Sequence, residues 1–387
     1  MNKLLISFLV LALFGSSCGS KLSNFLSKKT PHEEYAEKLE DRGLEKTPAG
    51  RAWLAASKKA LEQPYSIEVP FKLKGYFATD KPRALGLQFT ATRGQRLTFN
   101  ITKNETKPFV LYAELFKQDG ESHALIQAVD TAQTEFYIDI DEPGPYVLRL
   151  QPELFLSGAY SLSVATGPSL LFPVTGAKAK AGSFWGASRG GGKRSHEGVD
   201  IFAPKRTPVV AAADGVVTGV KEAGIGGKVV WLRLKDKNVT LYYAHLDKQL
   251  VREGQEVKKG ETVGLVGNTG NAKHTPSHLH FGVYTSAGPI DPYPFVNPLV
   301  QTASPVPDKK LTTLVRLNKP QKMRSGETIS KQTLMVPLAV TNEGYLTELP
   351  GGTIAQFAFS AVSTVTPPLK KETTTAGKNN NNNSTRM

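Results

Sequence analysis

The stretch Ser277-His278-Leu279-His280-Phe281-Gly282-Val283 decides how the central part of this chain is interpreted, because polar and apolar side chains alternate along it. On a β-strand, residues two apart share a face. We therefore expect Leu279, Phe281 and Val283 to face a core and both imidazoles to face a cleft. The Cα atoms of His278 and His280 would lie about 7 Å apart. One ring could then hold a metal while the other acts on the metal's substrate.

Histidine is concentrated around this stretch. The chain has 387 residues and seven histidines, and five of the seven lie between residues 196 and 280. Two of the five stand in His196-Glu197-Gly198-Val199-Asp200 and in Tyr243-Ala244-His245-Leu246. The only cysteine is Cys18. Imidazole and carboxylate are the ligands that suit zinc when thiolate is lacking, so this distribution predicts a zinc site.

The segment from His196 to Asp200 has to bend for both side chains to reach one ion. Gly198 and the β-branched Val199 and Ile201 argue against a helix. On a straight strand the two Cα atoms would lie about 13 Å apart, near the limit for sharing an ion. We therefore predict that His196 lies in a loop and that the chain bends near Gly198. The preceding residues 189–193 read as a flexible approach.

Three protein ligands and one water form the open tetrahedral site of a zinc hydrolase. A peptide hydrolase also needs a base that steers the water and a donor for the developing oxyanion. His245 and the non-ligating member of the His278/His280 pair could fill these two positions.

The combined motif resembles the lysostaphin/LytM-type zinc metallopeptidases. The resemblance rests on His-x-x-x-Asp, Tyr-Ala-His-Leu and His-x-His-Phe in this order, and on flanking strings such as Gly198-Val199-Asp200-Ile201-Phe202-Ala203-Pro204. It covers about residues 175–300 and implies an all-β domain of the duplicated hybrid motif type. Carried onto this sequence, it implies that one Zn²⁺ is held by His196, Asp200 and His280, that His278 is the general base, and that His245 positions or stabilises the hydrated transition state. Members of this family cut peptide bridges in bacterial peptidoglycan, so a zinc metalloendopeptidase is expected.

Two other functions remain open from the sequence. Degenerate members of the same family have lost ligands and activate other wall hydrolases, so a catalytically silent scaffold is one alternative. The presence of every ligand and both further histidines argues against it. The second alternative is a wall-binding lipoprotein whose zinc is only structural. A lipoyl-carrier barrel, suggested by Lys259-Gly260-Glu261-Thr262-Val263-Gly264, is dismissed because no carrier lysine lies between flanking hydrophobic residues.

The N-terminus predicts export. Lys3 precedes an apolar run over residues 4–14, and the small residues 15–17 come directly before Cys18, so residues 1–17 read as a signal peptide. Cys18 in this position resembles the lipidated cysteine of bacterial lipoproteins, although Gly15 stands where that motif usually has an aliphatic residue. A cleaved signal with an incidental cysteine is the alternative. An acylated Cys18 would anchor the protein to a membrane through its lipid.

The remaining segments complete a mainly β chain. We predict a helical spacer or packing helix in residues 18–64, with Thr47 as a helix N-cap, a β-sandwich in 65–166, the zinc peptidase domain in 170–300, an SH3-like barrel in 310–366 and a disordered tail in 367–387. His32 and His123 look incidental, and His274 is expected to be solvated.

The net charge of +14 favours an anionic partner such as cell-wall polymer. No Lys/Arg-rich block with interleaved aromatic residues suggests nucleic acid. The expected location is the cell envelope, lipid-anchored and facing the peptidoglycan.

Overall fold

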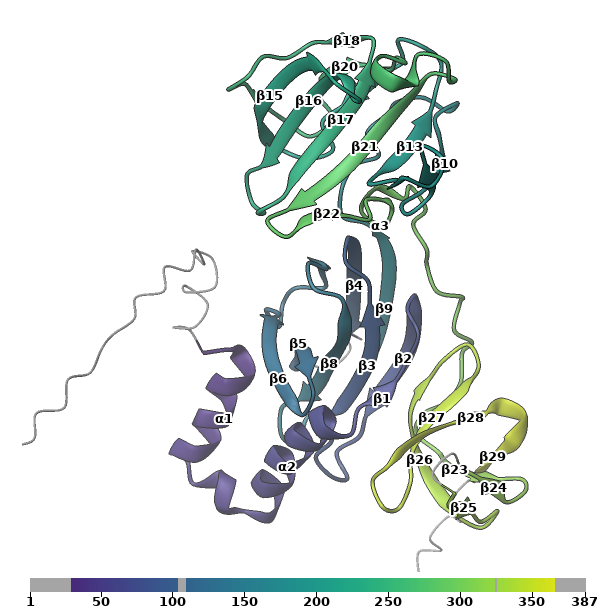
Figure 1. Ribbon diagram of the computed structural model, residues 1–387. Coiled ribbons are helices and arrows are strands. Elements are labelled where there is room, and N and C mark those ends of the chain that lie inside the picture. Colours follow the sequence, from purple (N-terminus) through teal and green to yellow (C-terminus); the bar gives the residue numbers. More distant parts are fainter. Residues whose placement is uncertain (1–28, 104–108, 324–325, 366–387) are drawn as a thin grey trace, which may run out of the picture.

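The computed structural model describes residues 29–103, 109–323 and 326–365, and it is mainly β as the sequence predicts. A β-sandwich lies in the middle of the molecule, with the region that carries the histidines at one end and the C-terminal strands at the other (Figure 1). The predicted signal peptide, Cys18 and the predicted tail lie outside the described residues. In the part of the chain that the structure describes, no helix is both long and apolar enough to span a bilayer.

Two helices, joined by the 3₁₀ turn η1 (Leu44–Lys46), precede the sandwich: α1 (Pro31–Asp41) and α2 (Pro48–Glu62). Thr47 caps α2 as predicted, because its hydroxyl accepts a hydrogen bond from the Gly50 N–H at 3.1 Å. Trp53 on α2 is 1% exposed and donates its indole N–H to the carbonyl of Pro152 in the sandwich at 2.8 Å. A side chain at Gly86 would place its Cβ 1.7 Å from the Ala60 carbonyl oxygen, so α2 touches the sheet. The helices pack on the sandwich, which supports the packing alternative over a free spacer.

His32, which the sequence suggested to be incidental, is part of a buried polar network between α1 and the sheet. Its ring stacks on Trp53 with centroids 4.7 Å apart, and its Nε2 lies 2.7 Å from Oε1 of Gln151. The guanidinium of Arg149 pairs with the carboxylate of Glu114 in the same network. Burial, followed by the nearby Arg149 charge, lowers the pKa of His32. No local sequence pattern indicates this network, because its members lie far apart along the chain.

The sandwich consists of two sheets, antiparallel except where β1 runs parallel to β3. The first sheet contains, in spatial order, β1 (Tyr65–Ser66), β3 (Leu85–Ala91), β8 (Gly144–Pro152), β5 (Leu111–Asp119) and β6 (Ser122–Ala128). The second contains β2 (Phe71–Phe77), β9 (Gly158–Pro168), β4 (Gln95–Lys103) and β7 (Glu135–Asp139). Alternate side chains of both sheets fill one core, as their period of two predicts.

The C-terminal module continues the second sheet. Its strands are β23 (Leu314–Leu317), β24 (Gln321–Lys322), β25 (Thr328–Ile329), β26 (Leu334–Val340), β27 (Gly344–Glu348), β28 (Ile354–Ala358) and β29 (Val362–Val365), with the 3₁₀ turn η3 (Phe359–Ala361) before the last. β26 pairs with β2 through Lys74 opposite Val340 and Gly75 opposite Ala339. Ala339 and Leu346 accordingly belong to the sandwich core. The SH3-like assignment stays a prediction, and the module is joined to the sandwich by backbone pairing.

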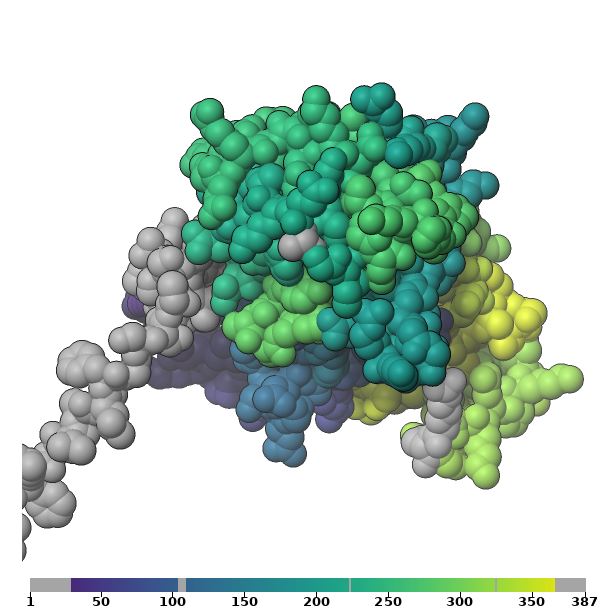
Figure 2. Space-filling model, turned by 45° about the horizontal axis from the view of Figure 1, so that its top comes forward, coloured from purple at the N-terminus to yellow at the C-terminus, as the bar shows by residue number. Residues whose placement is uncertain are grey.

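The histidine-rich region is a separate β unit with its own core. Its larger sheet has the order β10 (Lys180–Ser183), β13 (Val199–Phe202), β21 (His278–Thr285), β17 (Thr240–Leu246), β16 (Gly227–Leu234), β15 (Gly215–Ala223) and β19 (Glu256–Val257), with β22 (Gly288–Ile290) beside β21. A smaller sheet contains β14 (Pro208–Val210), β20 (Thr262–Leu265) and β18 (Lys248–Gln249). The short pair β11 (Ser188–Arg189) and β12 (Arg194–Ser195), the turn η2 (Gly270–Ala272) and helix α3 (Tyr293–Val296) complete it. This unit comes forward in Figure 2, with the C-terminal module (yellow) behind it.

Candidate metal centre

Two neighbouring strands bring the histidines and the aspartate to one face of the larger sheet. Asp200 on β13 stands directly opposite His280 on β21. Leu279, Phe281 and Val283 are fully buried on the other face, as the alternation predicts. His196 lies in the loop before β13, and the chain bends at Gly198, which confirms the predicted bend. A Cβ at Gly198 would lie 2.5 Å from the His280 ring, so only glycine fits at this bend.

Three donor atoms converge on one point. Nε2 of His196, Oδ1 of Asp200 and Nδ1 of His280 lie 3.0 Å from one another in each of the three pairs. A tetrahedral ion with ligand bonds of about 2.0–2.2 Å separates its ligand atoms by about 3.3–3.6 Å, so these donor atoms would move apart by only a few tenths of an ångström to bind one. Two imidazoles and one carboxylate at this spacing fit a zinc ion with one coordination position left open.

Hydrogen bonds outside the triangle orient two of the three ligands. His196 Nδ1 lies 2.9 Å from the carbonyl oxygen of Phe184, which can only accept. The proton therefore sits on Nδ1, and the lone pair of Nε2 points at the metal position. Oδ2 of Asp200 accepts from Nη2 of Arg189 at 2.8 Å, and the same nitrogen donates to Oγ of Ser183 at 2.6 Å.

Arg189 is a site residue that the sequence analysis missed. The glycines after it suggested a flexible segment, whereas β11 and β12 form an ordered pair that aims Arg189 at the aspartate. Burial by itself would raise the pKa of Asp200. The neighbouring His196 and His280, whose ring nitrogens lie 3.0 Å from Oδ1, outweigh burial and hold the pKa of Asp200 well below its usual range. The carboxylate is therefore ionised and ready to bind a cation.

His245 and His278 lie beside the triangle without belonging to it. Their ring centroids are 5.0 Å apart, and Nε2 of His278 lies 3.9 Å from Oδ1 of Asp200. Nδ1 of His278 donates to the carbonyl of Pro276 at 2.8 Å, and Nδ1 of His245 donates to the carbonyl of Thr269 at 2.9 Å. Both Nε2 atoms are therefore unprotonated in the neutral rings and can accept a proton.

His245 has two further unusual properties. Its φ of 62° lies in the left-handed region that non-glycine residues seldom adopt. Strained backbone of this kind clusters at functional sites, where the surrounding structure has to hold it in place. Burial, and then the neighbouring His278 and His280, lowers the pKa of His245 to about 4. The ring is accordingly neutral near pH 7.

Residues 194–292 match the model of peptidase family M23. This range contains the three candidate ligands and both neighbouring histidines, namely His196, Asp200, His280, His245 and His278. The chain carries a peptidase family M23 domain. Members of this family are zinc metallopeptidases, in agreement with the donor set of this site.

Several individual proteins are similar to parts of this chain. The L-Ala--D-Glu endopeptidase of Bacillus subtilis is 40% identical over 125 residues, which cover 29% of this chain and 38% of that protein. The peptidoglycan DD-endopeptidase ShyC of Vibrio cholerae is 40% identical over 88 residues, covering 23% of this chain and 20% of that protein. The catalytic domain of lysostaphin from Staphylococcus simulans is 32% identical, with a TM-score of 0.29 over 31% of this chain and 92% of that one. This chain thus spans well under half the length of the two curated relatives.

Of the histidines outside the M23 site, His274 is exposed, as expected. His123 carries a buried Nε2 with no hydrogen-bond partner among the described residues, and no role follows from its position.

Proposed function

We propose that this protein is a zinc metalloendopeptidase that hydrolyses peptide bonds of bacterial peptidoglycan. The observation that carries the proposal is the triangle of His196, Asp200 and His280, with two further imidazoles that present lone pairs beside it. A structural zinc site would need no such neighbours, because its four positions are closed by protein ligands. The names of two relatives, an endopeptidase and a peptidoglycan DD-endopeptidase, support the substrate class.

In the proposed reaction, water adds to the peptide carbonyl carbon and the C–N bond breaks. Zinc, when bound, supplies Lewis acidity and lowers the pKa of its water to about 7. His278 accepts the proton of the attacking water at Nε2 and passes it to the departing amine nitrogen. His245, the neighbouring neutral ring, positions the water through its own Nε2 lone pair. Both rings are held by backbone carbonyls, so neither has to reorient during the reaction.

The test is the release of soluble fragments from purified sacculi. Parent protein is expected to produce new muropeptides, whereas chelated protein and the His278→Ala variant are not. Adding zinc back should restore the chelated sample but leave the variant inactive. Equal output from all samples would reject the enzyme. No fragments from any of them would favour the scaffold that activates another hydrolase.

The envelope location rests on the same proposal. We propose that Cys18 is acylated and holds the protein at a membrane, with the M23 domain facing the wall. Metabolic labelling with a fatty-acid probe should mark the parent and leave Cys18→Ser unlabelled; equal labelling would reject the anchor. Binding to sacculi should weaken as salt rises, since the net charge of +14 would attract an anionic polymer.

A further inference from the structure

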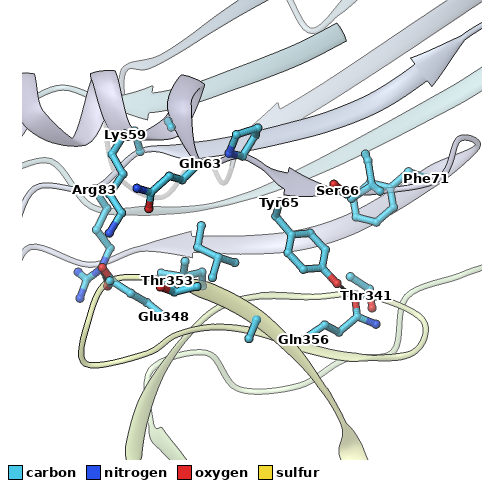
Figure 3. A pocket seen from close by; sticks show the side chains of 18 of the residues that line it. Lys59, Gln63, Tyr65, Ser66, Phe71, Arg83, Thr341, Glu348, Thr353 and Gln356 are labelled. Atoms are coloured by element: carbon cyan, nitrogen blue, oxygen red, sulfur yellow. Dashed lines mark hydrogen bonds and ion pairs between the residues drawn. The ribbon is translucent and has the colours of Figure 1, made fainter. Parts of the chain in front are cut away.

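A cavity of about 1110 Å³ lies between the end of α2, strand β1 and the C-terminal module (Figure 3). The elements that line it lie on the side of the sandwich away from the M23 domain (Figure 1), and none of its lining residues belongs to the metal centre. Its size exceeds the range of about 300–1,000 Å³ that is usual for small-molecule pockets. A segment of a polymer could therefore enter it.

The walls of the cavity are held at a fixed separation. Arg83, on the sandwich side, donates Nε to Oε2 of Glu348 on the C-terminal side at 2.7 Å, and both side chains are largely buried. Tyr65 on β1 donates its hydroxyl to Oε1 of Gln356 on β28 at 3.1 Å. The pairing of β26 with β2 joins the same two parts through the backbone. These contacts make the cavity a built feature of the fold, with its shape in place before any ligand arrives.

The charges around the cavity cancel. Its lining contains three basic and three acidic side chains, namely Lys59, Arg83 and Lys322 and then Glu68, Glu343 and Glu348. Of the acids, Glu348 is held by Arg83, and Glu343 accepts a hydrogen bond from the amide of Gln356 at 3.1 Å. A strongly charged ligand would find no net attraction here.

The lining of the cavity also contains uncharged polar side chains. The side chains of Gln63, Asn342 and Thr353 line it, and within the described residues none of these three side chains forms a hydrogen bond, although the backbones of Gln63 and Thr353 do. Amides and hydroxyls both donate and accept, so they suit a ligand with the same two capacities. Pro64 and Phe71 add apolar surface to the lining beside these groups.

We propose that this cavity binds the glycan strand of peptidoglycan. A chain of N-acetylated sugars carries hydroxyl and acetamido groups around the edges of its rings and apolar C–H groups on their faces, which match the free amides and the apolar surface. The stem peptides carry carboxylates and match a neutral lining less well. The inference rests on the proposed function for the identity of the polymer. In this arrangement the sandwich and the C-terminal module bind the polymer while a peptide branch reaches the metal centre.

The experiment titrates soluble, peptide-free glycan strands into the full-length protein by isothermal calorimetry. A Gln63→Ala/Asn342→Ala double variant removes two free amides from exposed positions, so folding should be retained and can be checked by circular dichroism. We expect its affinity for glycan to fall about tenfold, the effect of losing two neutral hydrogen bonds. Gln332→Ala, an exposed amide of the same module that does not line the cavity, should bind as the parent does.

The proposal is overturned if the parent does not bind glycan, if the double variant binds it as the parent does, or if free stem peptides bind and lose affinity in the double variant. Sacculus hydrolysis, measured on the same preparations, separates this inference from the proposed function. Cleavage without glycan binding removes the cavity proposal alone. If glycan binding depends on Gln63 and Asn342 but no cleavage occurs, the peptidase proposal fails and the binding-site proposal stands.

Discussion

Replacing Gly198 by alanine tests whether the metal centre depends on the close approach of the chain to His280. The added Cβ would lie 2.5 Å from Cε1 of His280 and 2.7 Å from the carbonyl oxygen of Phe281. Carbon atoms pack best at about 3.5–4.0 Å, so the new methyl intrudes by about 1 Å. The Phe281 carbonyl belongs to the central strand β21 and cannot yield easily, so the His280 ring has to move.

The size of the effect follows from this displacement. Overpacking of this kind costs about 1–3 kcal/mol of folding free energy. In the parent the three donor atoms lie 3.0 Å from one another. A shift of the His280 ring by even a fraction of an ångström moves its Nδ1 out of this triangle. We expect the affinity for zinc to fall by about 10- to 100-fold, as it does when the support of a metal ligand is lost.

The assay is competition for zinc against a chromophoric chelator, with urea unfolding of the metal-free protein alongside. Gly351→Ala is the matched control, because a Cβ there meets nothing within 4 Å. The reasoning is refuted if Gly198→Ala binds zinc as tightly as the parent and unfolds at the same urea concentration as the control.

Three further predictions concern the catalytic and buried residues. His278→Ala should lower sacculus hydrolysis by about 10²- to 10⁴-fold while zinc content stays stoichiometric; loss of zinc in this variant would make His278 a ligand. Trp53→Ala should cost about 3–5 kcal/mol in urea unfolding, because this 1%-exposed ring joins α2 to the sandwich; an unchanged midpoint would restore the free spacer. The folded-state pKa of His32 lies below its unfolded value of about 6.5, so the unfolded chain binds more protons as pH falls through that value and stability declines. His32→Gln should lose part of the stability difference between pH 7 and pH 5, and an identical pH profile would contradict the burial argument.

The sequence by itself determined the local features of the site. The alternation around His278 and His280 fixed which side chains share a face, because side chains on a strand alternate with a period of two. Gly198 and its β-branched neighbours were enough to predict the bend that frees His196 from the strand. The N-cap at Thr47 and the two-residue period of the sandwich were readable for the same reason, since each depends on residues close together in the chain.

Only the tertiary structure decided what depends on residues far apart in the chain. Arg189 reaches Asp200 because β11 and β12 pair, and glycine-rich sequence carries no signal for such an ordered contact. His32 meets Arg149 only when α1 packs on the sheet. The cavity exists because β26 pairs with β2, and the hydrogen bonds of a sheet edge are open to any strand that folding brings alongside. Such pairings are selected by the packing of the whole chain, and no local pattern specifies the partner.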